Sequence, residues 1–288
     1  MQTDSFFTKG VSHKVCEDYT MHGEIAGNPF IIVCDGCSGS DDTDFGARLL
    51  ARSAKRTLVG IHNSRAFDYA DTEDEKYSLL ENDIRANLGS MLKATESDIS
   101  VGDATLLMAF QYDSNIYVYM RGDGTFAYKD FETNVLTICT VEFLSGAPYY
   151  LTYDLSIMNA NAYKQQFNMN KTFKQVLISD TGEEIEHFPI SMTLPYHDHV
   201  FFKIPIYKKE FISIMSDGVS AFQYSSKYMG ERVSGAASTS NIVKEINSFK
   251  NFQGEFVQRR MNMAMRKFEK QGLENFDDVS IATIWLKD

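Results

Sequence analysis

Acidic residues stand at the ends of several predicted strands, where they could share a metal site. In chain order they are Glu17-Asp18, Asp35-Gly36, Asp123, Asp217-Gly218 and Asp277-Asp278. A single aspartate at a strand end is usually a turn former. A whole set favours another explanation, because clustered carboxylates repel one another unless they hold cations. Ligand sets made only of oxygen are typical of hard ions such as Mg²⁺ or Mn²⁺.

Glycine directly follows two of these aspartates, Asp35 and Asp217. A residue without a Cβ lets the backbone approach an ion closely, and the carbonyl oxygen of Gly36 could then be a ligand itself. The pattern therefore predicts a site for hard cations at the ends of strands.

Buried strands and amphipathic helices must position these residues. Apolar runs predict strands at 30–34, 104–112, 116–120, 125–128, 135–143, 211–215 and 279–286. Apolar residues at helical spacing predict helices at 45–58, 73–96, 241–249 and 255–270. We expect Thr43 or Asp44 to cap the first of these helices.

The order of the elements indicates an α+β fold, because the helices form two groups separated by strand-rich segments. Short turns between successive strands from 104 to 143 favour an antiparallel sheet. We expect mixed strands and loops from 145 to 199. Nothing in the composition marks a linker, so a single domain over 1–288 is the simplest arrangement.

The net charge of −11, in a chain with 43% hydrophobic residues, is typical of a globular protein that does not bind nucleic acid. An acidic protein also repels phosphate groups, so phosphate chemistry would need bound metals or a local basic group. We find no apolar run of membrane-spanning length, and the four cysteines show no disulfide pattern. We therefore expect a cytoplasmic protein without a membrane partner.

The ordered motifs resemble the protein phosphatase 2C family, in its compact bacterial branch. The first motifs are Ser12-His13-Lys14-Val15-Cys16-Glu17-Asp18, Val33-Cys34-Asp35-Gly36-Cys37-Ser38-Gly39-Ser40 and Asp44-Phe45-Gly46-Ala47. The later ones are Gly102-Asp103-Ala104-Thr105, Arg121-Gly122-Asp123-Gly124, Ser216-Asp217-Gly218-Val219 and Asp277-Asp278-Val279-Ser280-Ile281. The last motif is similar to the family's Asp-Asn-Ile-Thr-Val. The resemblance covers about residues 10 to 286.

The resemblance implies a four-layer α-β-β-α sandwich, with two central antiparallel sheets flanked by helices and a dinuclear metal centre at one end. It implies that Asp35 bridges two Mn²⁺ or Mg²⁺ ions. The implied further ligands are Glu17 and the Gly36 carbonyl for one ion, and Asp217 and Asp277 for the other. Asp18 would orient a water, and Asp123 would help Asp217 to hold a weaker third ion.

The resemblance further implies a phosphatase acting on phosphoserine and phosphothreonine in proteins. Two metal ions would activate a water that attacks phosphorus directly, without a covalent enzyme intermediate. A phosphorylated protein is then the expected partner, and we expect the enzyme to be a monomer.

Three positions depart from the family pattern. His13 stands where many members have an arginine that grips phosphate, so His13 and Lys14 are the candidates for that contact. Cys37 replaces a histidine proposed as general acid in eukaryotic members. Ala221 replaces an aspartate of the third metal site.

Several alternatives remain open. Cys34 and Cys37 form a C-x-x-C pair that could serve redox chemistry or bind zinc, and His197-Asp198-His199 could bind a metal, although a polar loop is the simpler interpretation. The departures at His13, Cys37 and Ala221 also fit a catalytically weak pseudophosphatase that acts as a regulatory binding module. A two-metal hydrolase of nucleotides or phosphodiesters is the third possibility.

Overall fold

Two antiparallel sheets form the centre of the protein. The computed structural model describes residues 1–167, 170–188, 199–224 and 235–287. Over these residues the larger sheet has the strand order β1 (Gln2–Thr8), β14 (Val279–Trp285), β11 (Lys209–Met215), β6 (Gly124–Asp130), β7 (Leu136–Phe143), β8 (Lys171–Ile178) and β9 (Glu184–Phe188). The smaller sheet has the order β10 (His199–Pro205), β5 (Asn115–Arg121), β4 (Ala104–Tyr112), β3 (Asn28–Gly36) and β2 (Tyr19–Ile25). A short hairpin pairs β12 (Phe222–Tyr224) with β13 (Leu273–Asn275).

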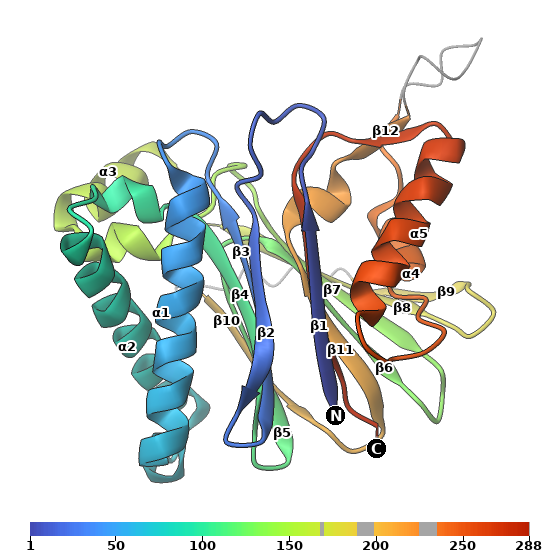
Figure 1. Cartoon of the computed structure of the whole chain (residues 1–288), viewed down its shortest axis with the longest axis horizontal. Helices are drawn as coiled ribbons and strands as arrows, with labels where there is room; N and C mark the ends of the chain where they lie inside the picture. The colour runs from blue at the N-terminus through green and yellow to red at the C-terminus, as the bar shows by residue number, and fades with distance from the viewer. Residues whose placement is uncertain (168–169, 189–198, 225–234, 288) are drawn as a thin grey trace.

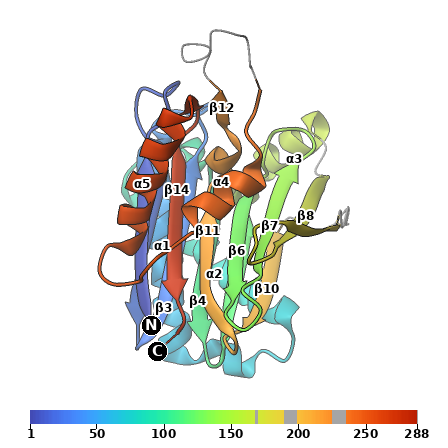
Figure 2. The ribbon, with the colours of Figure 1, turned by 90° about the vertical axis from the view of Figure 1, so that its right-hand side faces the viewer.

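Helices cover the outer face of each sheet (Figures 1 and 2). The helices α1 (Thr43–Ser64), α2 (Glu73–Ala94) and α3 (Ile157–Gln166) lie on the side of the smaller sheet. The helices α4 (Thr239–Ile246) and α5 (Phe256–Lys270) lie on the side of the larger sheet. The predicted α+β, four-layer arrangement is confirmed. None of the helices in the described parts of the chain is both long enough and apolar enough to cross a membrane.

Alternation along the strands builds three apolar layers. In β3, Phe30, Ile32 and Cys34 pack against α1 and α2. The intervening residues Ile31 and Val33 pack between the sheets. This two-sided burial explains why β3 and β4 are continuous apolar runs, since successive side chains of a strand point to opposite faces. Each fully buried aliphatic side chain contributes about 1.5–3 kcal/mol to folding.

Most predicted elements have their expected place, and the differences are local. The strands β1 and β2, before the first predicted strand, are additions, as is α3 within the segment expected to hold strands and loops. The predicted cap of the first helix is wrong: α1 begins at Thr43 after Asp42, whose φ of 55° is left-handed and whose side chain makes no capping bond. The hydroxyl of Thr43 points elsewhere, toward Glu17.

Candidate metal centre

The antiparallel topology brings the predicted acidic residues to one end of the sandwich. β3 runs toward this end and finishes there with Asp35-Gly36, and β11 runs the same way and is followed by Asp217. β6 and β14 start from it, so Asp123 and Asp277 lie beside them. The loop between β1 and β2, which carries Glu17 and Asp18, also lies at this end, whereas both termini lie at the opposite end (Figure 1).

Asp35 continues the face of β3 that packs against the other sheet, since it is in phase with Ile31 and Val33. Burial raises its pKa well above the usual value, and the nearby carboxylates of Asp18 and Asp217 raise it further. Asp217 also shares a hydrogen bond with it. A carboxyl group in this position is held in its neutral form unless a cation compensates the charge.

Two more predicted ligands are in the same electrostatic group. Burial raises the pKa of Asp123 to about 8, and repulsion by Asp217 adds to the effect. Burial also raises the pKa of Asp277, again with a contribution from Asp217, while His13 lowers it. Asp217 therefore lies close to Asp35, Asp123 and Asp277, although the four belong to segments far apart in the sequence.

Asp18 is buried behind this group. Its Oδ2 accepts a hydrogen bond from Ser216 Oγ at 2.9 Å, and Ser216 Oγ in turn accepts one from the backbone N–H of Ser280 at 3.0 Å. Burial raises the pKa of Asp18 to about 7, although the neighbouring hydroxyls of Ser280 and Ser216 lower it. Its other oxygen, Oδ1, is buried and has no hydrogen-bond partner among the described residues. Such an orphaned acceptor is costly unless an ion or water completes it.

Glu17 is held in place by one contact through its side chain and one through its backbone. Thr43 Oγ1, at the start of α1, donates to Glu17 Oε1 at 3.1 Å, and the Glu17 carbonyl accepts the N–H of Gly36 at 3.3 Å. A Cβ at Gly36 would lie 3.0 Å from that carbonyl and 2.9 Å from the carbonyl oxygen of Thr43. Glycine at 36 thus allows α1, β3 and the Glu17 loop to meet.

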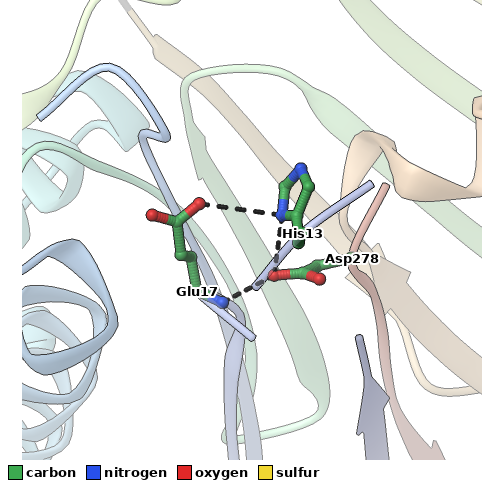
Figure 3. Close-up of side chains that lie close together, drawn as sticks. All are labelled: His13, Glu17 and Asp278. Carbon is green, nitrogen blue, oxygen red and sulfur yellow. Dashed lines mark hydrogen bonds and ion pairs between the residues drawn. The ribbon is translucent and has the colours of Figure 1, made fainter. Parts of the chain in front are cut away.

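His13 and Asp278 adjoin Glu17 (Figure 3). His13 Nδ1 lies 3.2 Å from Asp278 Oδ2 and 3.7 Å from Glu17 Oε2, while its Nε2 lies 3.2 Å from Asp277 Oδ1. Within the described ranges, one group of histidine, cysteine, aspartate or glutamate side chains has ligand atoms that all lie within 4.8 Å of one another. This group consists of His13, Glu17 and Asp278. Asp278 was not predicted as a site residue, although it stands in a quoted motif at the place of the family's asparagine.

The donor set fits divalent cations. It consists of carboxylates with pKa values raised by burial and mutual repulsion, one buried oxygen without a partner, and glycines at the points of closest backbone approach. Hard ions with oxygen ligands relieve this repulsion and satisfy the free oxygen. The predicted roles of the individual ligands stay predictions.

The departures from the family pattern lie around the same site. The thiol of Cys37 contacts the Tyr150 hydroxyl, whose pKa is raised by burial and by Cys37 itself. The Cys37 N–H donates to the Asp103 carbonyl at 2.9 Å. Lys14 is exposed on the same loop as His13. Ala221 follows the short turn that begins at Asp217 and brings no carboxylate.

The other candidate ligands are less suitable. Cys34 is fully buried in the apolar layer beneath α1, and burial raises the pKa of its thiol well above the usual value, which disfavours redox chemistry. All four cysteines are free thiols. His197 and Asp198 lie outside the described residues.

Comparison with known proteins identifies the family and the fold of the chain. The family model for protein phosphatase 2C matches residues 10–267. A crystal structure of a bacterial serine phosphatase is 11% identical with a TM-score of 0.54, over 100% of this chain and 98% of that one. The serine/threonine phosphatase Stp1 from Staphylococcus aureus has the same identity and TM-score and is covered to 95%. The S. agalactiae serine/threonine phosphatase is 13% identical with a TM-score of 0.50, over 99% of both chains.

At these identities the likeness to solved structures concerns the fold alone. No curated protein sequence matches the chain.

Proposed function

Because the chain belongs to the protein phosphatase 2C family, we propose that it is a metal-dependent phosphatase that hydrolyses phosphoserine and phosphothreonine in proteins. The observation that carries the proposal is the group of carboxylates at one end of the sandwich, whose pKa values are raised by burial and by one another. An acidic group of this kind destabilises the fold unless it holds cations, so its presence supports a working metal centre.

The proposed ligands follow the family pattern. Asp35, Glu17, the Gly36 carbonyl, Asp217 and Asp277 would hold Mn²⁺ or Mg²⁺ ions, with Asp35 as the ligand that they share. The ions supply an activated water and neutralise the phosphoryl group. Asp18, which accepts a hydrogen bond from Ser216, would orient that water.

Three further residues have subsidiary roles in the proposal. Asp123 helps Asp217 to hold a weaker third ion, for which Ala221 brings no ligand. Lys14 is the proposed phosphate contact, because its side chain is exposed on the loop between β1 and β2, next to His13. The phosphate contact predicted for His13 stays a prediction, since both of its ring nitrogens face carboxylates in the structure.

We propose a phosphorylated protein as substrate and a monomer as the active form, with 1–288 acting as one domain. The four free thiols support a reducing compartment, the cytoplasm.

The test is hydrolysis of p-nitrophenyl phosphate and of phosphothreonine peptides at increasing Mn²⁺ and Mg²⁺, with a chelator as the blank. We expect turnover that depends on the metal. Bound metal without turnover on either substrate would select the regulatory binding module. Turnover confined to a phosphodiester or nucleotide panel would select a two-metal hydrolase of another substrate.

A further inference from the structure

Asp278 is a buried carboxylate that none of the proposed metal roles uses. Only 2% of the residue is exposed. Its Oδ1 accepts the backbone N–H of Gly10 at 2.8 Å, and its Oδ2 accepts that of Glu17 at 2.6 Å. The same Oδ2 lies 3.2 Å from His13 Nδ1 (Figure 3). One side chain therefore contacts the β1–β2 loop near its start, in its middle and near its end.

Two more residues of this loop are hydrogen-bonded to the residues just before Asp278. The N–H of Val11 donates to the Asn275 carbonyl at 2.9 Å, and the hydroxyl of Ser12 donates to the Phe276 carbonyl. The loop lies between β1 and β2, and no helix or strand stiffens it. The segment 275–278 therefore holds several points of this loop, and it acts on Glu17 together with the contacts from Thr43 and Gly36.

An aspartate suits this place better than the asparagine of the family pattern. The two backbone N–H groups approach different oxygens of the side chain, and both oxygens of a carboxylate accept hydrogen bonds. An asparagine offers one oxygen and one NH₂ group, so one of the backbone donors would face another donor. Two of the positions that differ from the pattern, His13 and Asp278, are also in contact with each other.

We propose that Asp278 is a positioning residue of the metal centre, which holds the β1–β2 loop so that the Glu17 carboxylate reaches its ion, with His13 as its side-chain partner. This rests on the proposed function, because Glu17 acts there as a ligand. Residues that hold metal ligands in place typically change metal affinity by about 10–100-fold when they are replaced.

The test is Asp278→Asn, which keeps the size of the side chain and removes one acceptor. We expect the Kd for Mn²⁺, measured by calorimetry, to rise at least about tenfold. At saturating Mn²⁺, kcat and the KM for a phosphothreonine peptide should return to near wild-type values. Hydrogen exchange in the metal-free protein should show faster exchange of the Gly10 and Glu17 amides.

Asp4→Asn is the matched control. Asp4 is also buried, with 5% exposed, and its Oδ2 accepts two backbone N–H groups, those of Val257 at 2.6 Å and Gln258 at 3.2 Å. These belong to the start of α5, remote from the ligands. We expect Asp4→Asn to lower thermal stability without a change in the Kd for Mn²⁺. If Asp278→Asn behaves in the same way, the proposal is overturned.

His13→Gln provides a second measurement that does not depend on the folding of Asp278→Asn. We expect a rise of a few-fold in the Kd for Mn²⁺ with an unchanged KM. A raised KM with an unchanged Kd would instead assign His13 to the phosphate and contradict its partnership with Asp278.

The two proposals fail separately. A wild-type protein that binds Mn²⁺ without hydrolysing phosphate overturns the proposed function, while the Kd of Asp278→Asn still decides the positioning role. A wild-type protein that binds no divalent ion overturns both.

Discussion

Thr43 Oγ1 donates a hydrogen bond to Glu17 Oε1 at 3.1 Å, so the first residue of α1 orients a proposed metal ligand instead of capping its own helix. The same hydroxyl lies 3.2 Å from the Cys37 carbonyl. The contact joins the helix to the loop after β1 and to the turn after β3.

Thr43→Val should therefore weaken metal binding while the helix stays folded. We expect the Kd for Mn²⁺ to rise about tenfold, since a freed carboxylate side chain must be ordered again when the ion binds. Calorimetric titration measures this. Thr57→Val, in the same helix, is the control: its hydroxyl accepts a bond from Asn87 at 2.9 Å, away from the site, and the Kd should not change. Equal Kd values for all three proteins would remove the role of Thr43.

Asp35→Asn should abolish Mn²⁺ binding and turnover, because it removes the proposed bridging ligand. The metal-free protein should at the same time become more stable, since a carboxyl group whose pKa is raised by burial and by Asp18 and Asp217 is replaced by a neutral amide. Calorimetry, a phosphatase assay and thermal unfolding in chelator measure these effects. Asp83→Asn, exposed on α2, should change none of them. Substantial turnover by Asp35→Asn would sink the metal assignment.

The metal-free protein should lose stability as the pH rises. Burial raises the pKa of Asp18 to about 7 and that of Asp123 to about 8. In the unfolded chain an aspartate titrates near about 3.9. The folded state therefore keeps protons that the unfolded state has released, and the free energy of unfolding falls between about pH 4 and pH 8.

Denaturant titrations in chelator at several pH values measure this dependence. Asp18→Asn should make the profile flatter, and Mn²⁺ should restore stability at the upper end because it binds the deprotonated carboxylates. A stability that rises over this range in chelator would contradict the prediction.

Gly218→Ala should disturb both the fold and the site. A Cβ at this position would lie 1.8 Å from the backbone oxygen of Asp278, so that backbone must move. We expect a lower Tm and weaker Mn²⁺ binding. Gly60→Ala is the contrast, because nothing lies within 4 Å of its Cβ, and alanine within α1 should add about 0.5–1 kcal/mol to stability. A rise in Tm for both variants would show that the crowding is absent.

Arg121→Met should destabilise the protein strongly. The guanidinium is 1% exposed, lies 3.5 Å from Glu81 Oε2, hydrogen-bonds to Asp154 and covers the ring of Tyr149. Removing the charge leaves two carboxylates uncompensated, at a cost of about 3–5 kcal/mol. Denaturant titration measures the loss.

Two further variants separate charge from packing at Arg121. Adding Glu81→Gln and Asp154→Asn should recover part of the loss, whereas Arg65→Met, in an exposed pair with Asp68, should have little effect. If Arg121→Met is as mild as Arg65→Met, the buried contacts of Arg121 with Glu81 and Asp154 do not stabilise the protein.

The strands that carry the proposed ligands were predictable because they are buried on both faces. β3, β11 and β14 are near-continuous apolar runs, which identify them from the sequence. β1 was not, because polar residues interrupt it and Phe7 is exposed. α3 was missed because only Tyr163 of the helix is buried, and an aromatic cluster with Tyr149 holds it in place.

For the site, the sequence could predict only which positions supply ligands, from the order of the motifs along the chain. Motif order placed Asp35 and Asp217 among the ligands, but no local pattern reveals which side chains hold them. Asp278 is separated from Gly10 by 268 residues and from Glu17 by 261. Contacts of this kind depend on the complete fold, as does the bond from Ser216 to Asp18.

The chain passes from the smaller to the larger sheet within Gly122 and Asp123, and the proposed ligands are divided between the two sheets. Asp35 belongs to one sheet, whereas Asp217 and Asp277 adjoin strands of the other. The distance between these two groups of carboxylates is thus set by the packing between the sheets, which includes buried side chains such as Leu107 and Ile214. Larger or smaller side chains at these positions should therefore change the affinity for ions, although every proposed ligand stays the same.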